Sequence, residues 1–299
     1  MTAFMPELPE VETVRQGLAP VLTGRRIMRV EQRRPALRFP LPPHFAERLE
    51  GRRVKRLDRR AKYILVHLDG GEVLAIHLGM TGRFTVTSRV HRKGRQLGEF
   101  THDHGQHAKH DHLIFTISGG AVVTYNDARR FGYMTLIPEK QLEQDPFFKG
   151  LGVEPLGPEL TPTYLARRAR GRKADLKAFL MDQRIVAGLG NIYVCEALFR
   201  ARLNPWAAAA RLATKSSGAT AGARRLVEAI KRVLEDAIGA GGSTLRDYRH
   251  TNGDVGSFQH DFAVYGREGQ PCKRPACRGT VRRRMQGGRS TFYCPTCQR

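Results

Sequence analysis

The chain has 299 residues, of which 40% are apolar, so it is long enough for one or two folded domains and is not a disordered tail. It carries 51 lysines and arginines against 28 acidic residues, a formal net charge of +23. No run of 18 uncharged apolar residues and no secretory signal pattern occurs, so we expect a cytoplasmic protein without a membrane span. The charge predicts a polyanion as partner, although a general preference for arginine in a high-GC genome would give the same excess.

The first half of the chain predicts a leading helix and a series of strands. Apolar residues repeat with the period of one helix face between Val11 and Leu22, and Pro20 is expected to mark the far end of this helix. Glycine-rich turns separate four β-rich runs, at residues 63–68, 72–78, 112–117 and 121–125. We therefore assign residues 1–150 to a mostly antiparallel β domain.

The second half changes to a helical period. Residues 151–160 contain two prolines and two glycines, which is typical of a linker. Helical apolar spacing then follows at residues 176–180, 191–199 and 226–238. We assign residues 151–260 to a helical domain and 263–299 to a terminal module, and strands followed by helices indicate an α+β fold.

Four of the five cysteines lie in the terminal module. Cys272 and Cys277 form a C-x4-C pair, and Cys294 and Cys297 form a C-x2-C pair after sixteen intervening residues. Two such pairs across a hairpin-length spacer predict one structural Zn²⁺, which would supply the folding energy of so small a module. Two disulfides are the alternative, which a reducing compartment disfavours. Five arginines between the pairs predict a finger that contacts phosphate: Arg278, Arg282, Arg283, Arg284 and Arg289.

The N-terminus offers two methionines as possible starts, Met1 and Met5. If translation begins at Met5 and that residue is removed, Pro6 becomes a terminal secondary amine with a pKa in the α-amino range of about 7.7–8.0. Such an amine can attack the anomeric carbon of a sugar and displace a base, and Glu7 can serve as the adjacent general acid or base. On the residues alone, a plain helix entry is the favoured interpretation of this segment, and the enzymatic one is the alternative.

Motifs along nearly the whole chain, from residue 5 onward, resemble those of the bacterial formamidopyrimidine-DNA glycosylase family. The matching blocks are MPELPEVETVRQGL, RRAKYILVHL, HLGMTGRF, KHDH, YNDARRFG, MDQRIVAGLGNIYVCEALF, GGSTLRDY, VYGREGQPC and RSTFYCPTC. The resemblance implies an N-terminal antiparallel β-sandwich with a leading helix, then a helix–two-turns–helix domain and a zinc-finger β-hairpin. It further implies excision of 8-oxoguanine and formamidopyrimidines from double-stranded DNA, followed by strand cleavage through β,δ-elimination at the abasic site.

The resemblance also implies that residues 1–150 form the catalytic domain and that the functional chain begins at Pro6. It assigns catalysis to Pro6, Glu7, Lys62 and Arg289. Pro6 would form the imine, with Glu7 as the adjacent acid. Lys62 would donate a proton in β-elimination, and Arg289 would contact phosphate and act in δ-elimination.

Binding roles follow from the same resemblance. It assigns DNA contacts to His110, Arg129, Arg172, Met80, Phe131 and Asn191. Met80, Arg129 and Phe131 would fill the void left by an extruded nucleotide, whereas the strand pattern alone would make Met80 and Phe131 core residues. We expect a nucleoid-associated monomer with DNA across a basic cleft between its domains.

Three features depart from the family pattern. Residues 1–4 would acylate Pro6 and abolish its nucleophilicity, and the first cysteine pair is C-x4-C where many relatives have C-x2-C. Residues 88–110 look like an insertion, in which His102, His104 and His107 could form an accessory metal site or lie on a solvated surface loop.

Two other functions compete with oxidised-purine excision. The pyrimidine-selective, endonuclease VIII-like branch typically opens Pro-Glu-Gly-Pro-Glu, whereas this chain has Leu8 at the third position. A non-catalytic zinc protein that only binds DNA would share the charge and the cysteines.

Overall fold

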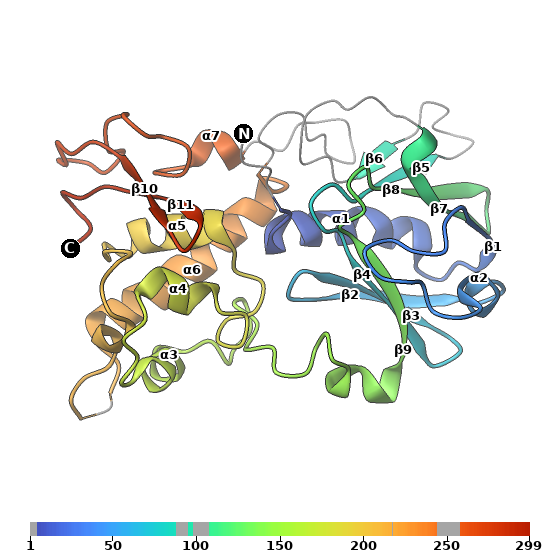
Figure 1. The fold of residues 1–299 in the computed structure, drawn as a ribbon, viewed down its shortest axis with the longest axis horizontal. Helices are drawn as coiled ribbons and strands as arrows, with labels where there is room; N and C mark the ends of the chain where they lie inside the picture. The colour runs from blue at the N-terminus through green and yellow to red at the C-terminus, as the bar shows by residue number, and fades with distance from the viewer. Residues whose placement is uncertain (1–4, 88–94, 98–107, 217, 244–257) are drawn as a thin grey trace. The chain divides into compact units, whose positions relative to one another are not determined.

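The computed structural model describes residues 5–87, 95–97, 108–216, 218–243 and 258–299 (Figure 1). The chain divides into two compact units: Met1–Lys149 with Ala240–Gln259, and Gly150–Gly239 with His260–Arg299. His102, His104 and His107, for which we considered a solvated surface loop or an accessory metal site, lie outside the described residues. Within the described ranges, no helix is long and apolar enough to cross a membrane.

The first unit begins with helix α1 (Leu8–Leu22). Its apolar face, formed by Leu8, Val11, Val14 and Leu18, is at most 1% exposed. The helix continues two residues beyond Pro20, the residue that we expected to mark its end. Proline lacks only its own N–H, so within the last turn it removes one hydrogen bond and leaves the backbone of the following residues helical.

Two antiparallel sheets enclose the core of this unit. The first contains, in spatial order, β1 (Ile27–Gln32), β7 (Asp111–Ile117), β8 (Ala121–Asn126), β5 (Arg83–Thr87) and β6 (Arg95–Leu97). The second contains β2 (Val54–Arg60), β3 (Tyr63–Leu68), β4 (Glu72–His77) and β9 (Tyr133–Pro138). Apolar side chains from both sheets and from α1 form one buried cluster, and α1 contacts strands of both sheets. The predicted N-terminal antiparallel sandwich with a leading helix is thereby confirmed.

Short elements complete the first unit. They are helix α2 (Phe45–Leu49) and the 3₁₀ turns η1 (Ala108–His110) and η2 (Glu139–Gln144). A further short helix, α7 (Phe258–Asp261), lies where the chain passes from the first unit into the second.

The second unit is helical and ends in a β-hairpin. Its elements are α3 (Pro162–Ala169), α4 (Leu176–Met181), α5 (Asn191–Arg200), η3 (Ala209–Leu212), α6 (Ala221–Gly239), β10 (Arg282–Gln286) and β11 (Arg289–Tyr293). Helix α5 is buried along almost its whole length, and α4, α6 and β11 pack against it. All three predicted helical runs are present, and α3 is an addition that the spacing did not indicate.

Candidate active site and zinc module

The residue pair predicted to carry the chemistry lies at the start of α1. Pro6 is buried, and Glu7 is only 4% exposed. Glu10, one turn along the helix, accepts the N–H of Glu7 on Oε2 at 2.9 Å. Its other oxygen, Oε1, accepts both the N–H and the hydroxyl of Ser243, each at 2.8 Å. Glu10 therefore joins the helix start to the Gly-Gly-Ser segment that begins at residue 241.

Sequence reasoning did not identify Glu10 as a site residue. It is 2% exposed, and a carboxylate is rarely buried unless its oxygens are satisfied. Its position three residues after the helix N-cap was a usable signal, because an acidic residue there commonly accepts the N-cap N–H. Its bonds to Ser243 span more than two hundred residues and left no such signal.

A cavity of about 530 Å³ in the first unit brings several predicted residues together. It is lined by Met5, Leu37, Arg38, His77, Gly79, Met80, Arg129, Arg130 and Phe131. Met5, the residue directly before Pro6, therefore lines the same cavity as the predicted void-filling residues Met80, Arg129 and Phe131. The guanidinium of Arg129 is 4.7 Å from the ring centroid of Phe131, which is 41% exposed and does not belong to the core as its strand pattern suggested.

His77 also lines this cavity, and like Glu10 it was not singled out by the sequence analysis. Its Nδ1 accepts the N–H of Gly79 at 3.0 Å, and its ring stacks on Tyr133 at 5.1 Å between centroids. Burial, and then the nearby cations Lys62 and Arg38, lower the pKa of His77 to about 4. The imidazole is therefore neutral near pH 7, and the accepting Nδ1 leaves Nε2 as the protonated nitrogen.

Lys62 lies in the tight turn between β2 and β3. The preceding residue, Ala61, has a left-handed φ of 51°, and the flanking residues Arg60 and Tyr63 pair across the turn. Because the charge of Lys62 acts on His77, the predicted proton donor is electrostatically coupled to the cavity. His110, at the end of η1, is half-buried in the same unit.

The second unit carries Arg172, Asn191 and Arg289. Arg172 is exposed just beyond α3, and Asn191 is the first residue of α5, where helix N–H groups favour an anion. Arg289 is exposed at the start of β11, after the turn made by Gly287 and Gly288, whose φ angles are 55° and 74°. Paired left-handed residues are the geometry that a two-residue hairpin requires.

Buried polar side chains fix this hairpin. The carbonyl oxygen of Ser290 accepts Nζ of Lys177 at 3.2 Å and Nδ2 of Asn191 at 3.0 Å. Lys177 also donates to the hydroxyl of Thr291 at 2.6 Å and is only 2% exposed. The backbone next to Arg289 is thus tied to α4 and α5, through a lysine that sequence reasoning did not single out.

Glu196 of α5 holds another segment of the second unit. Its carboxylate accepts the backbone N–H groups of Ala263, Val264 and Tyr265 at 2.8–2.9 Å. Burial nevertheless raises the pKa of this carboxyl group. The segment so fixed brings the hydroxyl of Tyr265 to 3.2 Å from Nδ2 of Asn191.

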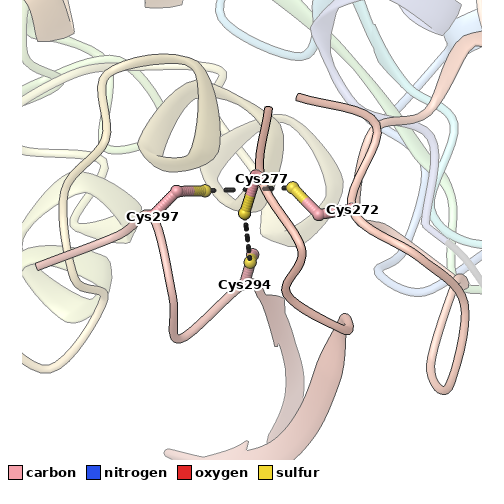
Figure 2. A group of neighbouring side chains, drawn as sticks. All are labelled: Cys272, Cys277, Cys294 and Cys297. Atoms are coloured by element: carbon pink, nitrogen blue, oxygen red, sulfur yellow. Dashed lines mark hydrogen bonds between the residues drawn. The ribbon is translucent and has the colours of Figure 1, made fainter. Parts of the chain in front are cut away.

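The four terminal cysteines converge as predicted (Figure 2). Their sulfur atoms all lie within 4.8 Å of one another, with 3.9 Å between Cys272 and Cys297 and 3.7 Å between Cys277 and Cys294. These separations far exceed a disulfide bond of about 2.05 Å. They match the edge of about 3.8 Å expected for a tetrahedron with Zn–S bonds of about 2.3 Å. The longer C-x4-C spacing therefore still permits a closed structural zinc site.

Comparisons with known proteins agree with this architecture. Residues 5–134 match the family model described as the formamidopyrimidine-DNA glycosylase N-terminal domain. Residues 151–249 match its H2TH domain, and residues 269–299 match the zinc finger found in FPG and IleRS. The chain is 58% identical over 298 residues to the formamidopyrimidine-DNA glycosylase of Methylobacterium sp. (strain 4-46), covering 98% of this chain and 99% of that protein. This chain belongs to the formamidopyrimidine-DNA glycosylase family.

Other relatives and solved structures of the family give the same result. The Cereibacter sphaeroides (strain ATCC 17025) glycosylase is 57% identical over 295 residues, which cover 99% of this chain and all of that protein. The crystal structure of the MutM (Fpg) protein from Thermus thermophilus has a TM-score of 0.80 at 40% identity, with 98% of each chain covered. A complex between the Lactococcus lactis Fpg and DNA containing an abasic site has a TM-score of 0.80 at 31% identity, covering 98% of this chain and 100% of that one.

Proposed function

We propose that this chain is a DNA repair glycosylase that excises oxidised purines from duplex DNA and then cleaves the strand at the abasic site. The observation that carries the proposal is the cavity in which Met5, directly before Pro6, meets Met80, Arg129 and Phe131. A nucleophile beside residues suited to support a distorted duplex is what base excision requires, because the target nucleotide must leave the stack.

The proposed chemistry begins on the nitrogen of Pro6. The match to the family model begins at residue 5, which supports translation from Met5, and removal of that methionine would then free the nitrogen of Pro6. The freed secondary amine attacks C1′ of the damaged nucleotide, the glycosidic bond breaks, and the base leaves with its bonding electrons. Glu7, buried beside Pro6, transfers a proton to the sugar oxygen or the leaving base. The nitrogen lone pair then breaks the C1′–O4′ bond, the released oxygen takes up a proton, and the product is a cationic imine (an iminium ion) between Pro6 and the opened sugar.

Elimination from that imine cleaves the strand. In β-elimination a proton leaves C2′ to water and the C3′–oxygen bond breaks, with Lys62 donating a proton to the departing phosphate. The electrostatic effect of Lys62 on His77 supports its presence near the cavity. Arg289 binds phosphate and acts in δ-elimination, in which a proton leaves C4′ to water and the C5′–oxygen bond breaks with its electrons on the departing phosphate. Its exposed side chain on a firmly anchored hairpin fits a phosphate contact.

The remaining residues bind DNA in this proposal. His110, Arg172 and Asn191 contact the phosphate backbone, and Met80, Arg129 and Phe131 occupy the space vacated by the extruded nucleotide. By segment, residues 1–150 act as the catalytic domain, 151–260 as the helix–two-turns–helix DNA-binding domain and 263–299 as the zinc finger. Zinc held by the four cysteines supplies folding energy to the finger and takes no part in bond breaking.

Replacement of Glu7 tests the catalytic assignment. In the chain translated from Met5, Glu7→Gln should slow release of 8-oxoguanine from a duplex by about 10²-fold or more, the usual scale for general acid–base catalysis, while DNA binding persists. Glu12→Gln is the matched control, because it makes the same change on the same helix at a carboxylate that pairs with Arg15 and Arg59. Unchanged excision by Glu7→Gln would refute the role.

Substrate comparison separates the proposal from the two competing functions. Single-turnover excision of 8-oxoguanine and of thymine glycol, each in the same duplex sequence, should favour the purine. A preference for thymine glycol would support the endonuclease VIII-like function instead. Tight binding of both duplexes with no excision of either would support a protein that only binds DNA.

A further inference from the structure

Two loops of the first unit carry the proposed void-filling residues. Residues 79–82 follow β4 and contain Met80, and residues 127–132 follow β8 and contain Arg129 and Phe131; we refer to them as the wedge loops. The side chains that would meet DNA are exposed or half-buried. Of the groups that join the two loops, Asp127 and Tyr125 are buried and Thr81 is half-buried, and the proposed function gives them no task.

Asp127 is the centre of the connection. It is fully buried, and its Oδ2 accepts the N–H of Gly132 at 2.8 Å and the hydroxyl of Tyr125 at 3.3 Å. Its Oδ1 accepts a short hydrogen bond from the hydroxyl of Thr81. The Thr81 oxygen in turn accepts the backbone N–H of Arg129 at 3.1 Å. One carboxylate and one hydroxyl therefore bridge both wedge loops.

The main chain of Asp127 extends this network. Its N–H donates to the carbonyl of His110 at 3.1 Å, and its own carbonyl accepts Nε2 of His112 at 2.8 Å. The same carbonyl accepts the N–H of Arg130 at 3.3 Å. Asp127 is thus tied to the proposed phosphate contact His110 as well as to the wedge loops.

Glycines allow the two loops to touch backbone to backbone. A Cβ added to Gly79, whose φ is +64°, would lie 2.3 Å from the nitrogen of Gly132. A Cβ added to Gly132 would lie 1.9 Å from the hydroxyl oxygen of Tyr125 and 3.0 Å from Oδ2 of Asp127. Contacts this close leave the loops little room to move independently.

We propose that Asp127 and Thr81 are positioning residues that hold the two wedge loops in one fixed arrangement, so that Met80, Arg129 and Phe131 enter the duplex together. This inference rests on the proposed function, since it needs the void-filling role of those three residues. The physical reason is preorganisation: side chains already held in position lose less conformational freedom when they displace a base. A buried, charge-assisted network is well suited to that task, because each of its groups becomes costly if left unpaired.

The test uses single-turnover excision on two duplexes, in the chain translated from Met5. One duplex carries 8-oxoguanine opposite cytosine, and the other carries it opposite an abasic-site analogue, where no partner base has to be supported. Thr81→Val keeps the side-chain shape and removes the hydroxyl, so Asp127 loses this donor and the Arg129 N–H loses its acceptor. Thr81→Ser restores the hydroxyl and serves as the conservative control.

Thr81→Val should slow excision opposite cytosine by about tenfold, the scale of one lost buried hydrogen bond. Opposite the abasic analogue the loss should stay below about threefold, because there is no stacked partner to hold apart. Thr81→Ser should recover the rate opposite cytosine. Adding Thr81→Val to Phe131→Ala should slow excision no further than the more affected single variant, because both act through the same wedge.

Three outcomes would overturn the inference. They are a normal rate for Thr81→Val opposite cytosine, an equal loss on both duplexes together with a lowered melting temperature, and full additivity with Phe131→Ala. Asp127→Asn provides a second variant on the same two duplexes should Thr81→Val fold poorly, with the same expected contrast. If the wild-type chain excises from neither duplex, the proposed function fails, whereas normal wild-type excision with an unaffected Thr81→Val refutes only the inference.

Discussion

Replacement of Glu10 by alanine should destabilise the first unit and impair its chemistry. The change removes the acceptor from three donors: the N–H of Glu7 and the N–H and hydroxyl of Ser243. Each buried donor left unpaired costs about 1–3 kcal/mol. Allowing for partial relaxation of the loop, we expect a loss of about 3 kcal/mol in the free energy of unfolding.

Urea denaturation of the wild type and of Glu10→Ala measures this loss. Ser243→Ala is the matched control, because it deletes only the hydroxyl and keeps the bond from the backbone N–H to Glu10, so it should cost about 1 kcal/mol or less. Imine formation should also slow at least tenfold in Glu10→Ala, since the backbone that carries Pro6 and Glu7 loses its anchor. A free energy of unfolding within about 1 kcal/mol of the wild type would refute the reasoning.

Two further predictions concern the cavity histidine and the zinc module. Burial holds the pKa of His77 at about 4 in the folded chain, below its ordinary value of 6.5. Between these two pH values the unfolded chain binds a proton at His77 that the folded chain does not bind. The free energy of unfolding should therefore fall as the pH drops from 6.5 to 4, by at most about 3 kcal/mol. Urea titrations at pH 7 and 4.5 should show a smaller fall in the free energy of unfolding for His77→Gln than for the wild type, and equal falls would contradict this. An NMR titration of Lys62→Gln should give a higher pKa for His77 than in the wild type, and an unchanged pKa would contradict the effect of Lys62. Cys294→Ser, or prolonged chelation, should remove one zinc per chain, as measured by elemental analysis, and should abolish DNA binding. The far-UV circular dichroism signal of the first unit should persist. Full DNA binding by metal-free protein would contradict a structural role for zinc.

The elements that could be predicted from the sequence are those with strong apolar patterns. The run at 63–68 coincides with β3 because five of its six residues are buried, and the run at 121–125 lies within β8. Strand β2 was missed for the opposite reason. It contains three arginines and only two buried residues, so it lacks the alternation or apolar run that indicates a strand. The exposed strand β10 was expected only because the family resemblance implies a zinc-finger hairpin.

The zinc site was predictable because cysteine spacing alone fixes which four sulfur atoms can meet. The anchoring residues Lys177 and Glu196 were not, because charged side chains are usually exposed and these two are buried against partners far along the chain. For Glu10 the local cap on Glu7 could have been inferred, but not the distant bonds to Ser243. Phe131 illustrates the converse error, since a strand pattern predicts burial whereas the loop after β8 leaves the ring 41% exposed.

A borohydride trap with peptide mapping tests the central claim most directly. The chain translated from Met5 and the chain translated from Met1 are each incubated with a duplex carrying one abasic site, reduced, digested and analysed by mass spectrometry, with intact mass reporting the N-terminus. We predict a cross-link at Pro6 in the chain whose mass shows Pro6 first, and none at Pro6 where residues 1–5 precede it and its nitrogen is an amide of Met5. Failure of a chain that begins with Pro6 to form any cross-link would contradict the imine mechanism proposed here, and a cross-link on a lysine would contradict Pro6 as the nucleophile.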